Sequence, residues 1–480
     1  MHWLDALEKF WPHLAAACDF LAAVFCSVHA LLCKRDSRAS ALWLGVIWLV
    51  PLLGPLLYLI FGVNRIRRSA VALGVHSVAI RPIPENFGEP EQLEAEHLRM
   101  MSRVVGRVVG RPLLPGNRIR PFVGGDEAFP AMLAAIESAQ KSISLCSYIF
   151  DNDPSGREFV AALGRAVKRG VEVRVLIDSA GARYSFPSIL HKLRHVKVPC
   201  ARFLPSSLFA PWRAATINLR NHRKVLAIDG RIAFTGGMNI RHGNCVAQNP
   251  KSPVLDMHFS VEGPAVEQLQ EAFVNDWAYT TKEILTGDKW FPELDEIDGT
   301  IARVISDGPD ADFEKLQWTL LAALTEAQTS VQIMTPYFLP NIPLITALNL
   351  AALRGVRVDI ILPAKNNLPF VHWASRAMWW QILERGCRIW LTPPPFDHSK
   401  LMIVDGHWVL MGSANWDARS LRLNFELNVE CYGRDFAQQM EKVIAHRTRD
   451  AHEVTLAEAD ARPLPVKLRD AIMRLFAPFL

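Results

Sequence analysis

A spaced motif that occurs twice is the feature that most constrains this chain. NHRKVLAIDGRIAFTGGMN (221–239) and HSKLMIVDGHWVLMGSAN (398–415) share one spacing of histidine, lysine, aspartate, two small residues and asparagine. The matched pairs are His222 and His398, Lys224 and Lys400, Asp229 and Asp405, Gly236 and Gly412, Gly237 and Ser413, and Asn239 and Asn415. Such a match does not arise twice by chance, so both copies must be presented by one repeated structural unit.

The sequence around each motif is repeated as well. AQKSISLCSYIF (139–150) resembles AQTSVQIMTPYF (327–338), and ALGRAVKRGVEVRVLI (162–177) resembles LNLAALRGVRVDIIL (348–362). Each half is predicted to run strand, helix, R-G-V turn, strand and then the motif. We therefore predict an α/β fold of two duplicated mixed-sheet halves, residues 126–295 and 296–462.

The N-terminal region has the composition of a membrane anchor. Residues 41–63 carry no charge over a length that spans a bilayer core, although Pro51, Gly54 and Pro55 predict a kink. Residues 12–33 are a second, weaker candidate, with a signal peptide as the alternative. The sequence predicts a transmembrane helical hairpin over residues 1–69. Basic residues flank both ends, so the positive-inside rule does not orient it.

Two further segments complete the domain plan. Residues 70–125, rich in proline and glycine, are predicted to be a connector with one amphipathic helical stretch near 91–110. Residues 463–480 predict an amphipathic helix whose apolar face consists of Leu468, Ile472, Leu475, Phe476 and Phe479. This face fits an interfacial helix on anionic lipid, and packing against the domain explains it equally well.

Composition supports an intracellular catalytic region. The chain has 480 residues, a length that suits about three units, and a mildly basic net charge of +5. Its eight cysteines are scattered without a C-x-x-C pair. This pattern is typical of reduced structural thiols rather than of a zinc site or a disulfide framework, and it favours the cytosol.

The paired motif suggests chemistry on a phosphodiester. If both copies converge, one imidazole can attack phosphorus while the other, protonated, donates to the leaving oxygen. The two lysines, with Asn239 and Asn415, would hold the negative charge of the transition state. We also expect the Gly237 amide and the Ser413 hydroxyl to bind phosphate oxygens. The sequence has no P-loop and no dense carboxylate cluster, so neither a metal nor a cofactor is predicted.

The motif aspartates allow two interpretations. Asp229 and Asp405 each precede a glycine between two apolar runs, and Asp-Gly in that position is a strong signal for a two-residue hairpin turn. A direct catalytic role is the other interpretation, and the sequence does not decide between them.

These motifs carry a family resemblance. H-x-K-x₄-D-x₆-G-[GS]-x-N, present twice, resembles the phospholipase D superfamily. VPLLGPLLYLIFGVNRIRR, the NHRK form of the first motif and SLRLNFELNVE after the second resemble bacterial cardiolipin synthases, across essentially the whole chain. The resemblance implies two phospholipase D-like halves and a multi-pass protein of the bacterial inner membrane, with its catalytic region in the cytoplasm.

The resemblance also implies a reaction. One phosphatidylglycerol would form a covalent phosphohistidine and release glycerol, and a second would take up the phosphatidyl group to give cardiolipin, without a metal. His222 would be the nucleophile and His398 the general acid, although the reverse order stays open. Asp256 and Glu426 would fix the histidine tautomers. Phosphatidylethanolamine as the phosphatidyl donor also stays open.

Two rival functions remain at this point. A membrane-anchored phosphodiester hydrolase, acting on lipid or nucleic acid, would use the same residues with water as acceptor. The mild basicity argues against a nuclease, and no nucleic-acid partner is expected; the expected partners are membrane phospholipids, phosphatidylglycerol and cardiolipin. A membrane scaffold with a dead site is the third interpretation, which two complete motifs disfavour.

Overall fold

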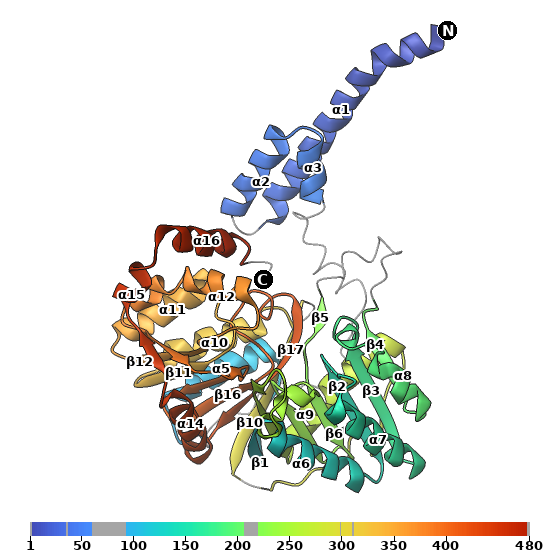
Figure 1. Cartoon of the computed structure of the whole chain (residues 1–480), viewed down its shortest axis with the longest axis vertical. Helices are drawn as coiled ribbons and strands as arrows, with labels where there is room; N and C mark the ends of the chain where they lie inside the picture. The colour runs from blue at the N-terminus through green and yellow to red at the C-terminus, as the bar shows by residue number, and fades with distance from the viewer. Residues whose placement is uncertain are drawn as a thin grey trace. The chain divides into compact units, whose positions relative to one another are not determined.

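The chain divides into two compact units, Met1–Ser69 and Ala70–Leu480. The structure is a computed structural model, and it describes residues 2–34, 37–59, 93–205, 219–297, 299–309 and 312–477. Figure 1 shows the elements of each unit.

The N-terminal unit contains three helices, α1 (His2–Cys33), α2 (Ser37–Leu49) and α3 (Leu53–Leu57). Helix α2 runs antiparallel to α1, because the Ser40 hydroxyl bonds the Ala30 carbonyl and the Trp48 indole bonds the Ser27 hydroxyl. Helix α3 then turns back, which brings Tyr58 onto the Trp43 ring. The three helices share a small apolar core.

Residues 41–63 do not form the single spanning helix that the sequence predicted. The helix ends at Leu49, before Pro51, and Leu52 has a φ of 64°. The chain reverses so tightly that a Cβ on Gly54 would lie 2.2 Å from the Val46 carbonyl oxygen. Pro51 and Pro55 each lack a backbone donor, which explains a full break instead of a kink. Residues 60–63 of this prediction lie outside the described residues.

Helix α1 contains the one described segment that is long and apolar enough to cross a membrane, His13–Cys33. Its outward residues are apolar: Phe20, Phe25 and Leu32 are all exposed. Leu49 and Leu52 are exposed in the same way at the α2–α3 reversal. An exposed apolar surface of this kind is typical of contact with lipid.

The second unit is built on one 16-stranded sheet, in which fifteen strands form one continuous path and β5 (Arg220–Asn221) lies off it. The first half contributes β4 (Cys200–Phe203), β3 (Glu172–Asp178), β2 (Ser142–Ser147), β6 (Val225–Ile228), β7 (Ile232–Gly236), β9 (Met257–Glu262) and β1 (Leu114–Val123). The second contributes β18 (His452–Val454), β13 (Arg388–Thr392), β12 (Arg357–Pro363), β11 (Ser330–Met334), β15 (Leu401–Val404), β16 (Trp408–Gly412), β17 (Asn424–Tyr432) and β10 (Thr300–Asp307). The strand order is thus the same from each end, apart from β18, and the halves join through the antiparallel pair β1–β10.

Helices cover both faces of each half, as parallel strand runs require. In the first half these are α6 (Gly125–Ser138), α7 (Pro154–Lys168), α8 (Ile189–His195) and α9 (Ala265–Thr281). The second half has α10 (Lys315–Glu326), α11 (Ile342–Leu353), α12 (Pro369–Arg376), α13 (Trp380–Leu383), α14 (Arg434–Thr448), α15 (Leu456–Asp460) and α16 (Leu464–Leu475). On β2, Ile143 and Leu145 belong to the core under α6 and α7, whereas Ser144 bonds Gln270 of α9. The duplicated α/β prediction is confirmed.

The segment predicted as a connector is largely part of this unit. Helix α5 (Leu98–Val109) buries Leu98, Met101 and Val105 in the core of the second half (Figure 1). Residues 114–123 form β1, which pairs with both β9 and β10. The first half therefore begins with this strand and not at residue 126. Pro115 and Gly116 misled the prediction, because they lie at the β1 irregularity.

Candidate active site

The two motifs occupy equivalent places at the centre of the sheet. His222 and Lys224 lie between β5 (Arg220–Asn221) and β6, and His398 and Lys400 lie between β14 (Phe396–Asp397) and β15. Each pair lies in the short segment just before a strand. Both motifs then continue into a hairpin whose second strand ends at Gly236 or Gly412.

Each motif crosses over to the other half of the molecule. Strand β5 pairs in parallel with β17, and the His222 backbone N–H donates to the Phe425 carbonyl at 2.9 Å. Strand β14 pairs in parallel with β8 (Val254–Leu255), and the His398 N–H donates to the Leu255 carbonyl at 2.7 Å. These two equivalent crossings bring histidines that are 176 positions apart in sequence (398 less 222) to the same region.

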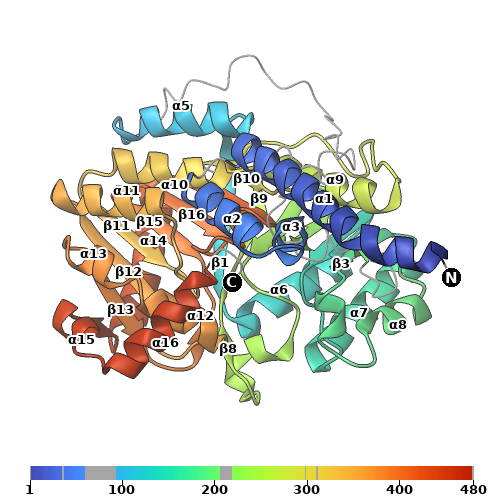
Figure 2. The same ribbon diagram turned by 90° about the horizontal axis from the view of Figure 1, so that it is seen from above.

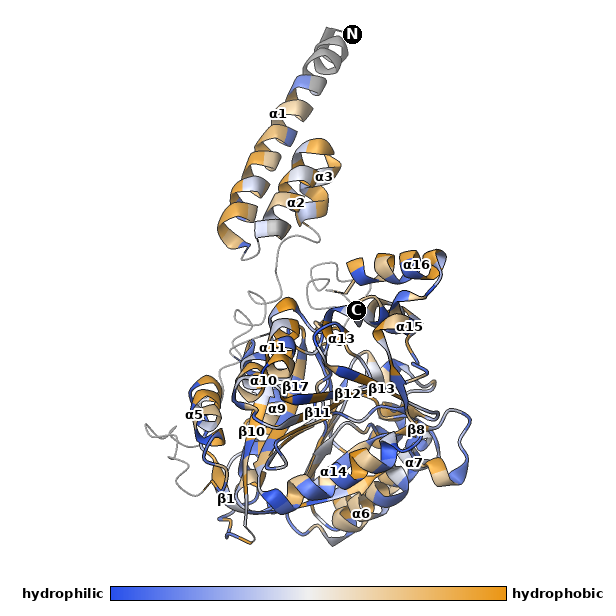
Figure 3. Cartoon of the chain, turned by 90° about the vertical axis from the view of Figure 1, so that its left-hand side faces the viewer, coloured by the Kyte–Doolittle hydropathy of each residue, from blue (hydrophilic) through white to orange (hydrophobic). Residues whose placement is uncertain are grey.

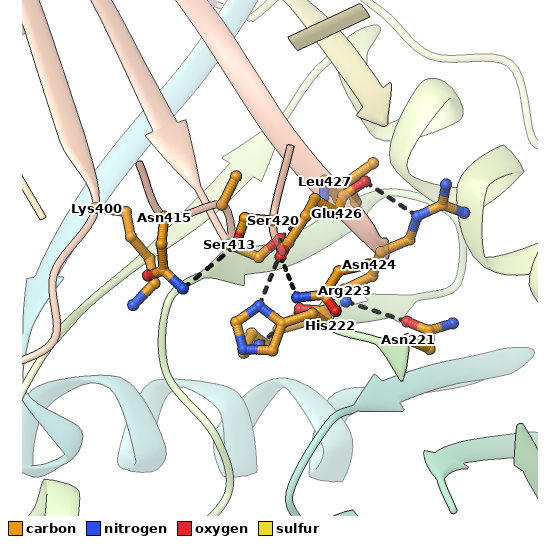
Figure 4. A network of polar contacts seen from close by, with 12 residues as sticks. Asn221, His222, Arg223, Lys400, Ser413, Asn415, Ser420, Asn424, Glu426 and Leu427 are labelled. Carbon is orange, nitrogen blue, oxygen red and sulfur yellow. Dashed lines mark hydrogen bonds and ion pairs between the residues drawn. The ribbon is translucent and has the colours of Figure 1, made fainter. Parts of the chain in front are cut away.

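The histidine rings are held across the same boundary. Nδ1 of His222 lies 2.9 Å from Oε2 of Glu426, and Nδ1 of His398 lies 2.8 Å from Oδ2 of Asp256 (Figure 4 for the first pair). Each carboxylate directly follows the residue whose carbonyl binds the backbone of the same histidine. With Nδ1–H directed at a carboxylate, Nε2 of each ring carries the free lone pair. The structure therefore brings together all four predicted residues, and each half supplies the carboxylate of the other.

The motif lysines are buried beside the histidines. Nζ of Lys224 donates to the His222 carbonyl at 2.6 Å, and Nζ of Lys400 donates to the His398 carbonyl and lies 2.8 Å from Nδ1 of that ring. Burial lowers the pKa of Lys224 to about 7 and that of Lys400 to about 8. Two buried amines that recover their charge when an anion is nearby suit a phosphodiester site.

Burial also determines the charge of the other groups. It lowers the pKa of His222, and it lowers that of His398 to about 4. Burial alone would raise the pKa of Asp256, but Lys400 and His398 hold it below its usual value; His222 and Lys224 do the same for Glu426. The site at neutral pH thus contains two neutral imidazoles, each bonded to an ionised carboxylate.

The motif aspartates lie in the turns and hold them. Asp229 and Asp405 both have a φ of 52°, and the glycine after each also has a positive φ, as a type I′ hairpin turn requires. The Asp229 carboxylate accepts the backbone N–H groups of Gln140, Lys141 and Ser142. The Asp405 carboxylate accepts the equivalent three N–H groups, from residues 328–330. Of the two interpretations, the geometry supports the turn.

Gly237 and Ser413 do not present groups to a phosphate, so the role predicted for them is corrected. Their backbone N–H groups donate to the carbonyls of Met257 and Leu427 within the sheet. The Ser413 hydroxyl donates to Oε2 of Glu426 at 2.5 Å (Figure 4). A Cβ at Gly237 would lie 2.3 Å from Oδ1 of Asp256. Both residues therefore position a carboxylate.

The two motif asparagines differ in what they bind. Oδ1 of Asn239 accepts the Ile149 N–H at 3.0 Å, which leaves Nδ2 as the donor it can offer. Nδ2 of Asn415 lies 3.3 Å from the Ser420 hydroxyl, and its buried Oδ1 has no partner among the described residues. Both side chains are buried, so contact with a phosphodiester requires a substrate that reaches into the site.

The sequence pattern indicated neither the aromatic neighbours of the histidines nor the buried Asp417. Tyr148 makes an edge contact with the His222 ring at 5.1 Å, and Tyr337 makes one with the His398 ring at 6.0 Å. Burial raises the pKa of Asp417 to about 6, and its Oδ1 accepts the Ser420 N–H. A signal for the tyrosines was present, because each stands shortly after the repeated strand, at positions 148 and 337.

Arg223, the third residue of NHRK, has a structural role that the sequence pattern did not indicate. It alternates with His222 and points to the opposite side, where its guanidinium donates to Asp276 of α9 at 2.7 Å. Its Nε donates to the Glu426 carbonyl at 3.1 Å, and Asn221 binds the second oxygen of Asp276. Strand alternation predicts the opposite direction but not these partners.

Among the described residues, no group of three or more His, Cys, Asp or Glu side chains is arranged to hold a metal ion.

Comparison with known proteins identifies the family. A family model described as "Cardiolipin synthase, PLD-like domain" matches residues 132–277 and 320–448, one segment in each half. The chain is 32% identical over 465 residues to a cardiolipin synthase of Geobacillus sp. (strain WCH70), covering 96% of this chain and 92% of that one. It belongs to the cardiolipin synthase family.

Other matches agree with this assignment. The cardiolipin synthase of Listeria monocytogenes serotype 4a (strain HCC23) is 30% identical over 474 residues, 96% of this chain and 97% of that one. A family model described as "Phospholipase_D-nuclease N-terminal" matches residues 21–62. The solved phosphatidylserine synthase of Haemophilus influenzae Rd KW20 has the same fold, with a TM-score of 0.61 at 16% identity over 79% of this chain and 100% of that one.

Proposed function

We propose that the protein makes cardiolipin by transferring a phosphatidyl group between two molecules of phosphatidylglycerol, through a covalent phosphohistidine. One observation carries the proposal: two imidazoles with free Nε2 atoms, each oriented by an ionised carboxylate from the opposite half and flanked by a buried lysine. Family membership supports the transfer to a lipid acceptor.

The first step forms one bond and breaks another. Nε2 of His222 attacks phosphorus, the bond to the glycerol oxygen breaks, and His398 donates the Nε2 proton to that oxygen. In the second step the hydroxyl of another phosphatidylglycerol attacks phosphorus and gives its proton to His398. The P–N bond then breaks and the electron pair returns to His222. Lys224 and Lys400 compensate the negative charge that develops on the phosphoryl oxygens.

The surroundings of the two rings support this order. The Lys400 ammonium lies 2.8 Å from Nδ1 of His398, whereas Lys224 contacts only the carbonyl of His222. A cation beside His398 makes its protonated form the stronger acid of the two. Because burial lowers the pKa of His398 to about 4, the bound phosphodiester anion must raise it before His398 can donate a proton.

We further propose that the chain is a multi-pass protein of the bacterial cell membrane with its catalytic unit in the cytoplasm. The exposed apolar surface of α1 supports the anchor. The cysteines of the described residues are all free thiols, and four of them are buried in the catalytic unit, as suits a reducing compartment. The second membrane pass stays a prediction, because α2 ends at Leu49.

The test uses the full chain in liposomes of phosphatidylglycerol with a chelator present, and follows products by mass spectrometry. We expect cardiolipin and glycerol in equal amounts, and a loss of at least about 10⁴-fold in both His222→Ala and His398→Ala. His191→Ala, an exposed histidine on α8, is the matched control and should keep full activity.

The other outcomes are distinct. Phosphatidic acid without cardiolipin would mean that water is the acceptor and the protein is a hydrolase. Product that forms only after phosphatidylethanolamine is added would change the donor and leave the chemistry in place. Quenching in denaturing detergent at mildly alkaline pH, which preserves the acid-labile P–N bond, should trap the phosphatidyl group on His222. A label found on His398 would reverse the two roles.

A further inference from the structure

Helix α16 carries an apolar stripe that none of the described residues of the catalytic unit covers. Leu464, Leu468, Ile472, Leu475 and Phe476 are all exposed, Leu475 to 73%. Their spacing places them on one side of the helix. Figure 3 shows hydrophobic (orange) stretches along α16. Packing against the domain, one of the two interpretations open from sequence, therefore does not explain this face.

The opposite side of α16 is the one that packs. Met473 and Ala477 join an apolar cluster with Leu339 and Val371, and α16 lies along α12 (Figure 2). Asp470, fully buried, is bonded by Arg462 and Arg469 at 2.7 Å and by Arg376 at 3.3 Å. The helix is therefore rigidly attached with its apolar stripe outward.

The surface around the stripe is positively charged. Three arginines share the single carboxylate of Asp470, which leaves a net positive charge at the base of the helix. Lys467 and the exposed Arg474 add to it from α16 itself. An outward apolar face flanked by cations is the arrangement by which a helix binds an anionic lipid surface.

The packed side of α16 adjoins the candidate active site. The cluster that holds Met473 and Ala477 includes Tyr337, whose ring contacts that of His398. At the start of α12, Leu368 and Phe370 are exposed as well. A lipid surface bound here would present headgroups next to the catalytic histidine of the second half.

We propose that α16 docks the catalytic unit onto an anionic bilayer and so delivers the lipid substrate to the site. This inference rests on the proposed function for the identity of the substrate. The occupant is the membrane surface; the alternatives, the chain's own N-terminal helices or a second copy of the chain, are outcomes of the test.

The first measurement needs no catalysis. Amide hydrogen exchange of the full chain in bilayer discs should slow in residues 464–477 when phosphatidylglycerol replaces phosphatidylcholine. Leu468→Glu/Leu475→Glu should abolish the difference, and Ile284→Glu, an exposed apolar residue after α9, should keep it. Protection that is equal in both lipids would mean that protein covers the stripe and would overturn the proposal.

The second measurement separates docking from chemistry. With long-chain phosphatidylglycerol in vesicles, the double variant should lose at least about tenfold in kcat/KM, while short-chain phosphatidylglycerol dissolved below its micelle concentration should be turned over within about twofold of normal. Equal losses on both substrates would overturn the proposal by showing a structural defect. If the wild type forms no cardiolipin at all, the proposed function fails, and the exchange experiment still decides the docking.

Discussion

The two halves share one fold but support their histidines with different chemistry. Behind His222 stands a serine–glutamate pair, in which Ser413 donates to Glu426 and also accepts the Leu427 N–H. Behind His398 stands a glycine–aspartate pair, in which Asp256 occupies the space next to Gly237. His222 is thus supported by a glutamate that receives an extra hydrogen bond from a serine. His398 is supported by the shorter aspartate, which faces a glycine and receives no such bond.

An ion pair connects each motif segment to a covering helix, and the two halves place the positive and negative partners the opposite way round. In the first half Arg223, directly after His222, bonds Asp276 on α9; in the second, Asp397, directly before His398, pairs with Arg447 on α14 at 3.4 Å. Helices α9 and α14 are equivalent, since α9 follows β9 and α14 follows β17, which holds the same place in the strand order. Both halves thus have a buried ion pair at this place, but the charges of its two partners are exchanged. The two halves therefore share their backbone geometry and differ in their electrostatics.

Removing the carboxylate charges should give the largest effect. Glu426→Gln and Asp256→Asn keep the shape but weaken the orientation of His222 and His398, and each should lower kcat by about 10²–10⁴-fold. A substrate with a phenolate leaving group needs no protonation on departure. It should therefore restore the first step in Asp256→Asn but not in Glu426→Gln.

The measurement is rapid-quench release of the phenolate. Glu453→Gln, exposed on β18, is the control and should behave as the wild type. Restoration in Glu426→Gln alone would show that His398 is the nucleophile and would reverse the comparison.

Exchanging the small residues Gly237 and Ser413 should lower activity by an intermediate factor. Gly237→Ser places an atom against Oδ1 of Asp256 and pushes the carboxylate away from His398, for an expected loss of about 100-fold. Ser413→Gly removes one hydroxyl from Glu426 and should cost about tenfold in kcat. Combining Gly237→Ser with Asp256→Glu copies the other half and should recover part of the loss. A double variant no better than Gly237→Ser would show that the two arrangements are not interchangeable.

Sequence and structure agree where local pattern determines the result. The repeated spacing gave the two halves, and Asp-Gly gave both hairpins, because turn geometry depends on adjacent residues alone. The pairing of each histidine with a carboxylate of the other half could not be predicted from the sequence. His222 and Glu426 are 204 positions apart, and nothing in either motif indicates which carboxylate binds which ring. The function of Ser413 depends on the same long-range pairing, so its small size suggested a phosphate contact instead.

The turn aspartates should give the smallest effect, and one on stability instead of catalysis. Besides the three backbone N–H groups common to both turns, Asp405 accepts the Thr329 hydroxyl and bonds His97, just ahead of α5, at 2.8 Å. Asp405→Ala should therefore lower the free energy of unfolding by about 2–3 kcal/mol, and Asp229→Ala by about 1–2 kcal/mol. Thermal unfolding of the full chain in detergent measures both, and per-molecule activity of the folded protein should stay within about twofold.

The effect of Asp405 should also depend on pH. Burial would raise its pKa, but the N–H groups of Ser330, Gln328 and Thr329 outweigh this and hold the pKa below its usual value. A carboxyl with a lowered folded-state pKa stabilises the protein fully above its unfolded value of about 4 and loses that contribution as pH falls through the folded value. The gap in melting temperature between wild type and Asp405→Ala should therefore narrow below about pH 4. A gap that is constant or widens in acid would mean that Asp405 acts as a spacer and not as a charged acceptor, and the two turns would then be equivalent.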